Sequence, residues 1–199
     1  MSAHGHAHVD NAAISNRVKM LVARLERAAL TSEAELDELI ELFLRSARKE
    51  NGYRAVARAW LDSGYKARLL ADASAALAEI GIDLSHWSPV KLRVVENTEE
   101  THNIIVCTLC SCYPIALLGP SPKWYKSEAY RARVVRDPRS VLAEFGVTLP
   151  PERSIAVWDS TAEARYMVLP QRPPNTNDLE ETALASLVTR DGLIGAALV

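Results

Sequence analysis

The sequence lacks the features that would tie a protein to nucleic acid or to a membrane. Its 199 residues carry 23 Lys and Arg against 25 Asp and Glu, so the formal net charge is only -2. Without a basic face or an acidic block, nucleic acid is excluded as an expected partner. No apolar run approaches the roughly 20 residues of a membrane helix. Residues 1–11 also lack a hydrophobic signal core, so we expect a cytoplasmic protein with no membrane contact.

Cysteine is scarce, and its placement excludes a disulfide framework. The three cysteines, Cys107, Cys110 and Cys112, fall within six consecutive positions. Sulfurs this close in sequence cannot link distant parts of a fold, so we expect them to serve chemistry. The remaining composition, 48% hydrophobic and 24% charged, is typical of a soluble globular protein rather than a disordered or fibrous one.

The first part of the chain has helical periodicity. Residues 1–11 are small and polar and are predicted to form a flexible tail, whose histidines are either solvated or a loose metal site. Ser32 and Glu35 form the pattern of a capping box. Residues 12–81 are predicted to form a helical arm that packs on a partner subunit, with a break at Asn51-Gly52 and a C-cap at Gly81. The expected helices span residues 14–25, 36–44, 53–60 and 66–80.

After Gly81 the pattern changes to short β-rich runs. Strands are predicted over residues 92–95, 103–106, 154–159 and 164–169, and helices over 139–145 and 179–188. The fold class is therefore predicted to be α+β, with the N-terminal helical arm followed by a layered α-β metal-binding domain over residues 82–199.

The segment I-V-C-T-L-C-S-C-Y-P, residues 105–114, can direct three sulfurs toward one point from a turn that follows an apolar strand. A structural zinc site would need a fourth ligand, usually from a second cysteine pair. His102 is the only imidazole nearby. A zinc-binding module therefore stays open as an alternative, although the sequence supplies few ligands for it.

A different coordination fits the C-S-C turn better. The backbone nitrogens of Ser111 and Cys112 point the same way as the flanking sulfurs, so deprotonated amides would complete a plane of two nitrogens and two sulfurs. Cys107 would add an axial sulfur and leave a sixth position open. Such anionic ligands suit a trivalent low-spin transition ion better than Zn²⁺. An open position favours metal-assisted hydration or hydrolysis.

The run C-T-L-C-S-C-Y-P resembles the metal-binding signature of nitrile hydratase α subunits and of the related thiocyanate hydrolase γ subunits. Further blocks that look like this family extend from about residue 55 to residue 195. They include A-W-L-D at 59–62, V-E-N-T at 95–98, W-Y-K at 124–126 and R-Y-M-V-L-P-Q-R-P at 165–173. Matches this dense make chance recurrence of a short motif an inadequate explanation.

The resemblance implies a ligand set and its chemistry. Cys107, Cys110 and Cys112 would ligate through sulfur, and Ser111 and Cys112 through amide nitrogen. Cys110 would be oxidised to a sulfinic acid and Cys112 to a sulfenic acid, whose oxygen acts as nucleophile or base, so these two are the expected catalytic residues. Thr108 is typical of the cobalt type, where the iron type usually has serine. We therefore expect Co(III), with Fe(III) as the alternative.

The implied enzyme is a hydro-lyase that hydrates a nitrile to its amide. In this family two arginines of the β subunit hold the oxidised cysteines, so an obligate β-type partner is expected, together with an activator protein that loads the metal. Glu163 and Arg165 would form a hydrogen-bonded shell around the site, or else are an ordinary turn carboxylate and strand-edge arginine. Tyr113 and Ile115 are expected to line the substrate pocket.

The chain departs from the family pattern beside the cysteine loop. Trp-Pro, which follows Cys-Tyr-Pro in the family, is replaced by Ile115 and Ala116, and H-W-S-P at 86–89 replaces Gly-Leu-Gln-Gly. These changes indicate an altered or larger substrate space, or compensating changes in the partner. A thiocyanate hydrolase γ-type subunit and a non-catalytic metal-binding homologue both remain alternatives, and the V-E-N-T block favours nitrile hydratase.

Overall fold

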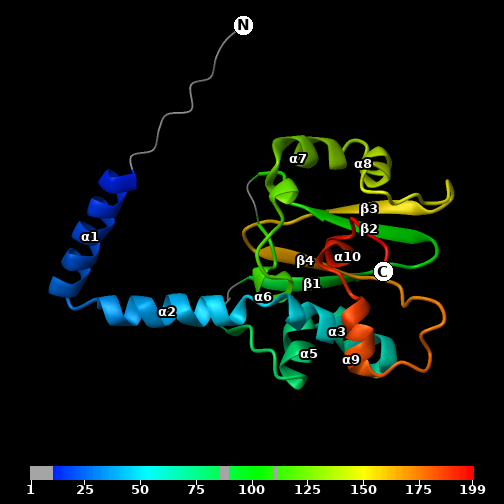
Figure 1. Cartoon of the computed structure of the whole chain (residues 1–199), viewed down its shortest axis with the longest axis horizontal. Coiled ribbons are helices and arrows are strands. Elements are labelled where there is room, and N and C mark those ends of the chain that lie inside the picture. Colours follow the sequence, from blue (N-terminus) through cyan, green and yellow to red (C-terminus); the bar gives the residue numbers. More distant parts are fainter. Residues whose placement is uncertain (1–10, 86–89, 110–111) are drawn as a thin grey trace, which may run out of the picture. The chain divides into compact units, whose positions relative to one another are not determined.

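The computed structural model describes residues 11–85, 90–109 and 112–199, and it divides the chain into two compact units (Figure 1). The first ends at Ser46 and the second spans Ala47–Val199. The sequence placed this division at residue 81. The difference arises because the helices between residues 47 and 81 belong to the core of the second unit, where Ala55, Leu69 and Leu77 are fully buried. The expected α+β class is confirmed.

The first unit consists of α1 (Asn11–Arg27) and α2 (Glu33–Ser46). The predicted capping box is confirmed at the start of α2. The Ser32 N–H donates to Glu35 Oε2 at 2.8 Å, and the Glu35 N–H donates to Ser32 Oγ at 3.2 Å. These hydrogen bonds from Ser32 also hold the pKa of the Glu35 carboxyl below its ordinary value. Residues 1–10, which include most of the predicted tail, lie outside the described residues.

The second unit begins with three helices joined by aspartate caps: α3 (Lys49–Leu61), α4 (Ser63–Ala71) and α5 (Ala73–Glu79). The prediction of one continuous helix over residues 66–80 is wrong. Asp72 ends α4 and its carboxylate accepts from the Ala75 N–H at 3.1 Å, which starts a new helix in another direction. Such competition between a short polar side chain and the backbone favours caps over helix interiors. The predicted C-cap is confirmed, since Gly81 has φ +77°.

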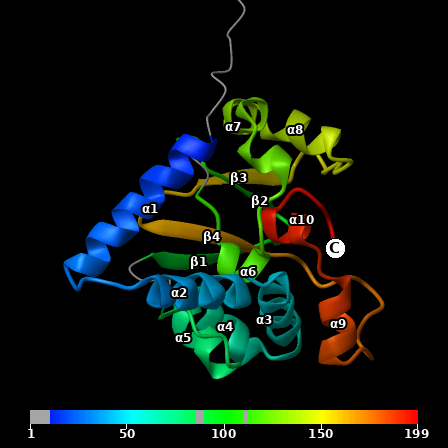
Figure 2. The same ribbon diagram turned by 60° about the vertical axis from the view of Figure 1, so that its left-hand side comes forward.

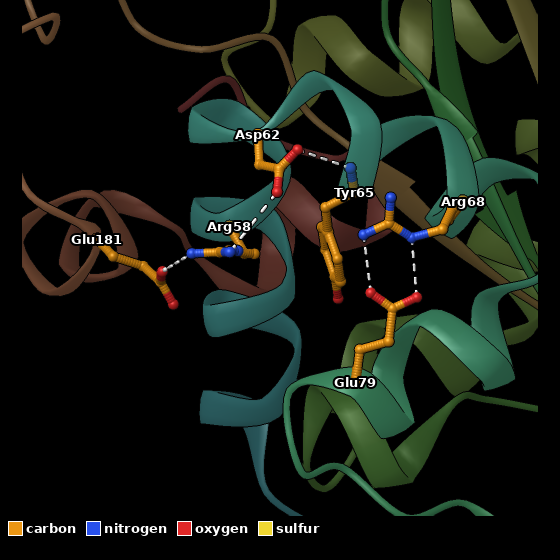
Figure 3. A network of polar contacts seen from close by, with 6 residues as sticks. All are labelled: Arg58, Asp62, Tyr65, Arg68, Glu79 and Glu181. Atoms are coloured by element: carbon orange, nitrogen blue, oxygen red, sulfur yellow. Dashed lines mark hydrogen bonds and ion pairs between the residues drawn. The ribbon is translucent and has the colours of Figure 1, made fainter.

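Ion pairs connect α4 with α5 and α3 with α9 (Glu181–Leu187), as Figure 3 shows. Arg58 lies 3.6 Å from Asp62 and 3.4 Å from Glu181 of α9. Arg68 donates to both carboxylate oxygens of Glu79, at 2.9 and 2.8 Å, and so joins α4 to α5. Because these groups are exposed to solvent, which screens their charges, each pair contributes little to the stability. They set the orientation of the helices more than the overall stability.

Four strands form two parallel pairs among the described residues, and all four were predicted. They are β1 (Lys91–Glu96), which pairs with β4 (Ala164–Leu169), and β2 (Thr101–Val106), which pairs with β3 (Ser154–Asp159). Helices α4 and α5 contact β1, whereas α8 contacts β3, so helices cover both sides of the strands (Figures 1 and 2). The predicted helix over residues 139–145 is α8 (Pro138–Glu144). The sequence did not predict four short helices: α6 (Ile115–Leu118), the 3-10 helix η2 (Lys123–Lys126), α7 (Glu128–Val134) and α10 (Arg190–Ile194).

Two glycines allow close approach of helices and strands. A Cβ on Gly52 would lie 2.6 Å from the Leu117 carbonyl oxygen of α6 and from Leu193 Cδ1 of α10. Gly52 is therefore part of α3 for packing reasons, and the predicted break at Asn51-Gly52 is wrong. Gly195 has φ +88°, and a Cβ there would collide with the carbonyl of Asn103 in β2. Only glycine permits this conformation and this contact together.

His102 joins β2 to the C-terminal segment. Its ring is fully buried, with Nε2 2.8 Å from the Gly195 carbonyl oxygen and Nδ1 3.3 Å from Asn97 Nδ2. Because a carbonyl only accepts and an amide NH₂ only donates, this pairing fits the neutral ring protonated at Nε2. Burial lowers the pKa of His102, and the nearby Arg153 charge lowers it further. Within the part of the chain described, no helix has the length and apolar character needed to span a bilayer.

We predict that Gly52→Ala destabilises the protein although alanine is the better helix former. The new methyl group would meet the backbone oxygen of Leu117, which cannot rotate away, so we expect a loss of about 1–3 kcal/mol in the free energy of unfolding. Gly64→Ala is the matched control, because its Cβ would approach side-chain atoms rather than backbone, at 3.2 Å from Asp62 Oδ1 and 3.4 Å from Arg68 Nη1. Urea unfolding of the two variants measures the difference, and equal stabilities would contradict the packing explanation.

A second prediction concerns pH. Because the folded-state pKa of His102 is lowered, the unfolded chain binds its proton first as pH falls below the ordinary value of 6.5. The contribution of the neutral His102 ring to the free energy of unfolding is therefore complete above pH 6.5. It is lost as the pH decreases toward the lowered pKa of the folded state. Between pH 7.5 and 5.5, the free energy of unfolding should fall less for His102→Gln, which has no titrating group, than for the wild type. Parallel pH profiles would show that His102 does not supply this dependence.

Candidate metal centre

The cysteine loop begins at the carboxyl end of β2. Ile104, Ile105 and Val106 are fully buried, and Cys107 follows with an exposed fraction of 1%. Parallel strands end at the same edge of a sheet, so the end of β3 lies beside this loop, with Val106 paired to Asp159. Cys112 is half-buried at the other end of the loop. Cys110 and Ser111, both predicted ligands, lie outside the described residues.

Asp159 holds the first turn of the loop. Its Oδ1 accepts from the Thr108 N–H at 2.9 Å, and its Oδ2 accepts from Thr108 Oγ1 at 2.5 Å. The Ser160 N–H donates to the Val106 carbonyl at 2.7 Å, and an Arg131 Nη1 donates to the Thr108 carbonyl at 3.3 Å. The peptide groups before and after Cys107 are thereby each held by a hydrogen bond, through the Val106 carbonyl and the Thr108 N–H, which limits the directions in which the Cys107 sulfur can point.

Two buried tyrosines support the loop from the η2 and α7 side. Tyr125 donates its hydroxyl to the Cys112 carbonyl at 2.9 Å, and Tyr130 donates to the Ile105 carbonyl at 2.6 Å. Burial raises the pKa of both phenols, so each remains a neutral donor. The ring of Tyr113 packs edge-on against Tyr125 with centroids 4.9 Å apart, and Trp124 packs on Tyr130 at the same spacing. The loop therefore lies on a rigid aromatic base.

The available donors fit a sulfur-rich site better than tetrahedral zinc. Cys107 and Cys112 are at the two ends of one short loop, so a common ion between them needs no long-range ligand. His102, the one histidine that the structure describes, has both ring nitrogens in hydrogen bonds to Gly195 and Asn97 and lacks a free lone pair for a metal. Across residues 11–85, 90–109 and 112–199, no group of three or more His, Cys, Asp or Glu side chains is arranged to hold a metal. Among the residues that the structure describes, the zinc alternative thus has no free imidazole to act as a fourth ligand.

A cavity of about 300 Å³ opens beside Cys112. Both predicted pocket residues, Tyr113 and Ile115, line it, as does Arg165. Arg165 donates through Nη1 to the carbonyls of Thr161 and Ala164 at the turn before β4. Glu163 does not line this cavity. Its Oε2 accepts from Thr161 Oγ1 at 2.9 Å, and that hydrogen bond holds the pKa of the exposed Glu163 carboxyl below its ordinary value.

Sequence reasoning missed the residues that hold the loop. Asp159 carries a recognisable signal, because it is a carboxylate at the end of a predicted strand, yet its pairing with Thr108 depends on β2 lying next to β3. Tyr125 and Tyr130 fell within blocks that resembled the family but had no assigned role. Lys126, in the W-Y-K block, also had no assigned role, and the apolar residues Leu84, Val90 and Leu92, which line the cavity, had no distinguishing pattern in the sequence.

Comparison with known proteins gives consistent matches over nearly the whole chain. The family described as "Nitrile hydratase, alpha chain" matches residues 12–197. The α subunit of the low-molecular-weight cobalt-containing nitrile hydratase from Rhodococcus rhodochrous is 48% identical over 188 residues, which is 94% of this chain and 90% of that protein.

Two solved structures share the fold. A double mutant of the Fe-type nitrile hydratase from Comamonas testosteroni Ni1 is 41% identical, with a TM-score of 0.81 over 95% of this chain and 91% of that one. A recombinant thiocyanate hydrolase with partially modified cobalt centres is 38% identical, with a TM-score of 0.85 over 94% of this chain and 89% of that one.

The Asp159 contacts predict an effect on metal retention. Asp159→Asn keeps an acceptor for the Thr108 N–H but removes the charge and the second carboxylate oxygen that accepts from the Thr108 hydroxyl. Changes to residues that orient metal ligands typically lower metal affinity by roughly 10–100-fold. We expect a decrease in that range when metal content is measured by elemental analysis at increasing chelator concentration.

Asp178→Asn is the control for this experiment. Asp178 is an exposed loop residue outside the cysteine loop, and its substitution removes the same charge. Equal metal retention in the two variants would show that the Asp159 contacts do not stabilise the site.

Proposed function

The chain belongs to the nitrile hydratase α-chain family, and on that premise we propose that it is the metal-carrying subunit of an enzyme that hydrates a nitrile to the corresponding amide. The observation that carries the proposal is the cysteine loop at the end of β2, with Cys107 buried and Cys112 beside a cavity of about 300 Å³. The reaction adds one water molecule across the carbon–nitrogen triple bond and needs a metal ligand set next to a small-molecule site.

The proposed ligands are the sulfurs of Cys107, Cys110 and Cys112 and the amide nitrogens of Ser111 and Cys112. Cobalt is supported by the printed name of the 48% identical relative and by Thr108, the residue typical of the cobalt type. Iron remains the alternative, because a structure 41% identical to this chain is an Fe-type enzyme. A bound Co(III) ion would supply Lewis acidity that polarises the nitrile or activates water.

The chain's own residues hold the loop and exclude water from one side of it. Asp159 and Tyr125 fix the two ends of the loop through Thr108 and the Cys112 carbonyl. Cys112, oxidised to a sulfenic acid, would present an oxygen toward the cavity as nucleophile or base. Arg165 lies at the same cavity, where its charge would stabilise such an oxygen, whereas Glu163 would act only through the turn that carries Arg165.

A β-type partner subunit is part of the proposal. Leu109, inside the cysteine loop, is 90% exposed in this chain by itself, and burying such a side chain against a partner is favourable. Within the first unit, Leu39, Phe43 and Leu44 of α2 are exposed by 60%, 44% and 66%. We propose that these apolar residues also pack on the partner, as expected of a helical arm.

Thiocyanate hydrolysis is the second candidate function. It is favoured by the TM-score of 0.85 to thiocyanate hydrolase, the higher of the two structural scores given above. Sequence identity points the other way by a small margin, with 48% over 94% of this chain to the nitrile hydratase α subunit and 46% over 73% of this chain to a thiocyanate hydrolase γ subunit. Identity reports on side chains, which determine the reaction, so nitrile hydration is the better supported function.

The decisive experiment is turnover by this chain purified with its natural partner subunit after growth with cobalt. Propionitrile and thiocyanate are offered separately, and the amide and residual thiocyanate are measured. We expect amide formation and cobalt near one ion per chain. Cys107→Ala and Cys112→Ala should each lose the cobalt and reduce turnover to background, because each removes a sulfur ligand.

Consumption of thiocyanate without amide formation would make the second candidate correct. Full cobalt retention in the Cys107→Ala variant would contradict the proposed ligand set, and zinc in place of cobalt and iron would contradict the metal.

A further inference from the structure

A separate cavity of about 330 Å³ lies in the second unit, where the segment that follows β4 meets the last residues of the sequence (Figure 1). Arg153, which comes just before β3, lines it as well. This cavity shares no lining residue with the one beside Cys112, and none of its lining residues belongs to the cysteine loop. A molecule bound here would therefore not contact the proposed metal ligands.

Neutral groups hold the guanidinium of Arg153 in place. Its Nη2 donates to Gln171 Oε1 at 2.6 Å and to the carbonyl oxygen of Thr98. Its Nε is buried and has no hydrogen-bond partner among the described residues. Because a guanidinium presents five N–H donors in a planar fork, Arg153 keeps donors for a ligand after these two hydrogen bonds.

Arg172, on the segment after β4, lines the same cavity and is also held by neutral acceptors. Its Nε donates to Thr176 Oγ1 at 3.1 Å, its Nη2 to the Thr176 carbonyl at 2.6 Å and its Nη1 to the Trp60 carbonyl at 3.2 Å. No carboxylate side chain lines the cavity, although both arginines are half-buried. Since buried charges are normally paired, two guanidiniums around one cavity indicate a site for an anion.

The positive charge of Arg153 acts on the groups around it. The pKa of Glu100 is lowered by a hydrogen bond with Thr98 and also by the Arg153 charge. Burial lowers the pKa of His102, and Arg153 lowers it further. Glu100 does not line the cavity, so an anion inside it would face the two guanidiniums without a lining carboxylate side chain to repel it.

The rest of the lining is largely apolar. It includes three prolines and two aliphatic residues, namely Pro170, Pro173, Pro174, Ala197 and Leu198. Inorganic phosphate could accept from the arginines but would leave these side chains against water. A carboxylate is planar and matches the guanidinium fork, and a hydrocarbon part attached to it would cover the apolar wall. The lining therefore favours an organic carboxylate over an inorganic anion.

We propose that this cavity binds a small organic carboxylate, whose oxygens accept hydrogen bonds from Arg153 and Arg172 and whose hydrocarbon part packs on the prolines and Leu198. The inference goes beyond the proposed function and does not depend on it. A ligand held here would join the segment before β3 to the segment after β4. By mass action it would also stabilise the folded state, because the unfolded chain lacks the site.

The test uses calorimetry on the complex with the natural partner, at constant ionic strength, with benzoate, acetate and inorganic phosphate as probes. We expect benzoate to bind about tenfold more tightly than acetate or phosphate, because it alone covers the apolar wall. Benzoate should also raise the Tm of the complex. Arg153→Gln should weaken benzoate binding about tenfold, since a hydrogen bond to a charged group is lost.

Arg54→Gln is the matched control for Arg153→Gln. Arg54 is an exposed residue of α3 that donates to the Ile80 carbonyl at 2.8 Å, and it does not line the cavity. Its substitution removes the same charge and a hydrogen bond to a backbone carbonyl. The affinity for benzoate should equal that of the wild type.

A second pair of variants provides a test should Arg153→Gln fail to fold. Leu198 lines the cavity and is 55% exposed, so a polar side chain is tolerated there. Leu198→Glu would place a carboxylate beside the arginines and repel benzoate, with an expected loss of about tenfold in affinity relative to Leu198→Gln. Glutamate and glutamine have nearly the same shape, so the difference between these two variants reports the charge.

The location of the ligand is checked directly by the bromine anomalous signal in crystals of the complex grown with 4-bromobenzoate. A bromine peak between Arg153 and the prolines is the expected result. A peak at another place, or equal benzoate affinity in the wild type, Arg153→Gln and Leu198→Glu, would overturn the assignment. Phosphate binding as tight as benzoate would overturn the organic carboxylate.

Failure of benzoate to bind the complex at all would refute the site, including the case in which the partner subunit covers the cavity. None of these outcomes bears on nitrile turnover. The proposed function and this inference can therefore fail separately.

Discussion

The parallel pairing of β2 with β3 is the constraint on which the proposed metal centre depends. It places the end of each strand at one edge, so that Asp159 lies next to Val106 and can accept both hydrogen bonds from Thr108. Side chains alternate between faces along a strand, so a register shift of one residue would turn Asp159 away from the loop. Cys107 would then lose the support of the peptide group that follows it. The chemistry of the loop is thus a consequence of strand register.

The register is in turn determined by contacts far away in sequence. Gly195 approaches the backbone of Asn103 so closely that no other residue fits, and His102 accepts and donates hydrogen bonds that join β2 to Asn97 and to Gly195. The C-terminal segment therefore fixes the position of β2 at His102 and Asn103. Because protein cores are close-packed, such contacts have one arrangement rather than a continuous range. The position of Cys107 depends on them although none of these residues touches a sulfur.

The sequence was informative where the signal is local. Apolar and β-branched runs located all four strands, Ser32 and Glu35 located a cap, and the resemblance of C-T-L-C-S-C-Y-P led to the family that the comparisons confirm. It failed where tertiary packing overrides local preference. Asn51-Gly52 predicted a break in the helix, but Gly52 lies inside α3, where α6 and α10 approach it closely. The support from Asp159 and Tyr125 was also invisible, since it depends on which strands and helices become neighbours.

The two ends of the cysteine loop have separate environments, and this separation has a functional consequence. The Cys107 end contacts Thr108, Asp159 and the buried end of β2, so changes there act on how the ligands are held. The Cys112 end continues into α6, whose first residue, Ile115, faces the cavity. Side chains on α6 can therefore vary in size while the hydrogen bonds at the other end are unchanged. This arrangement allows the cavity beside Cys112 to vary independently of the proposed metal site.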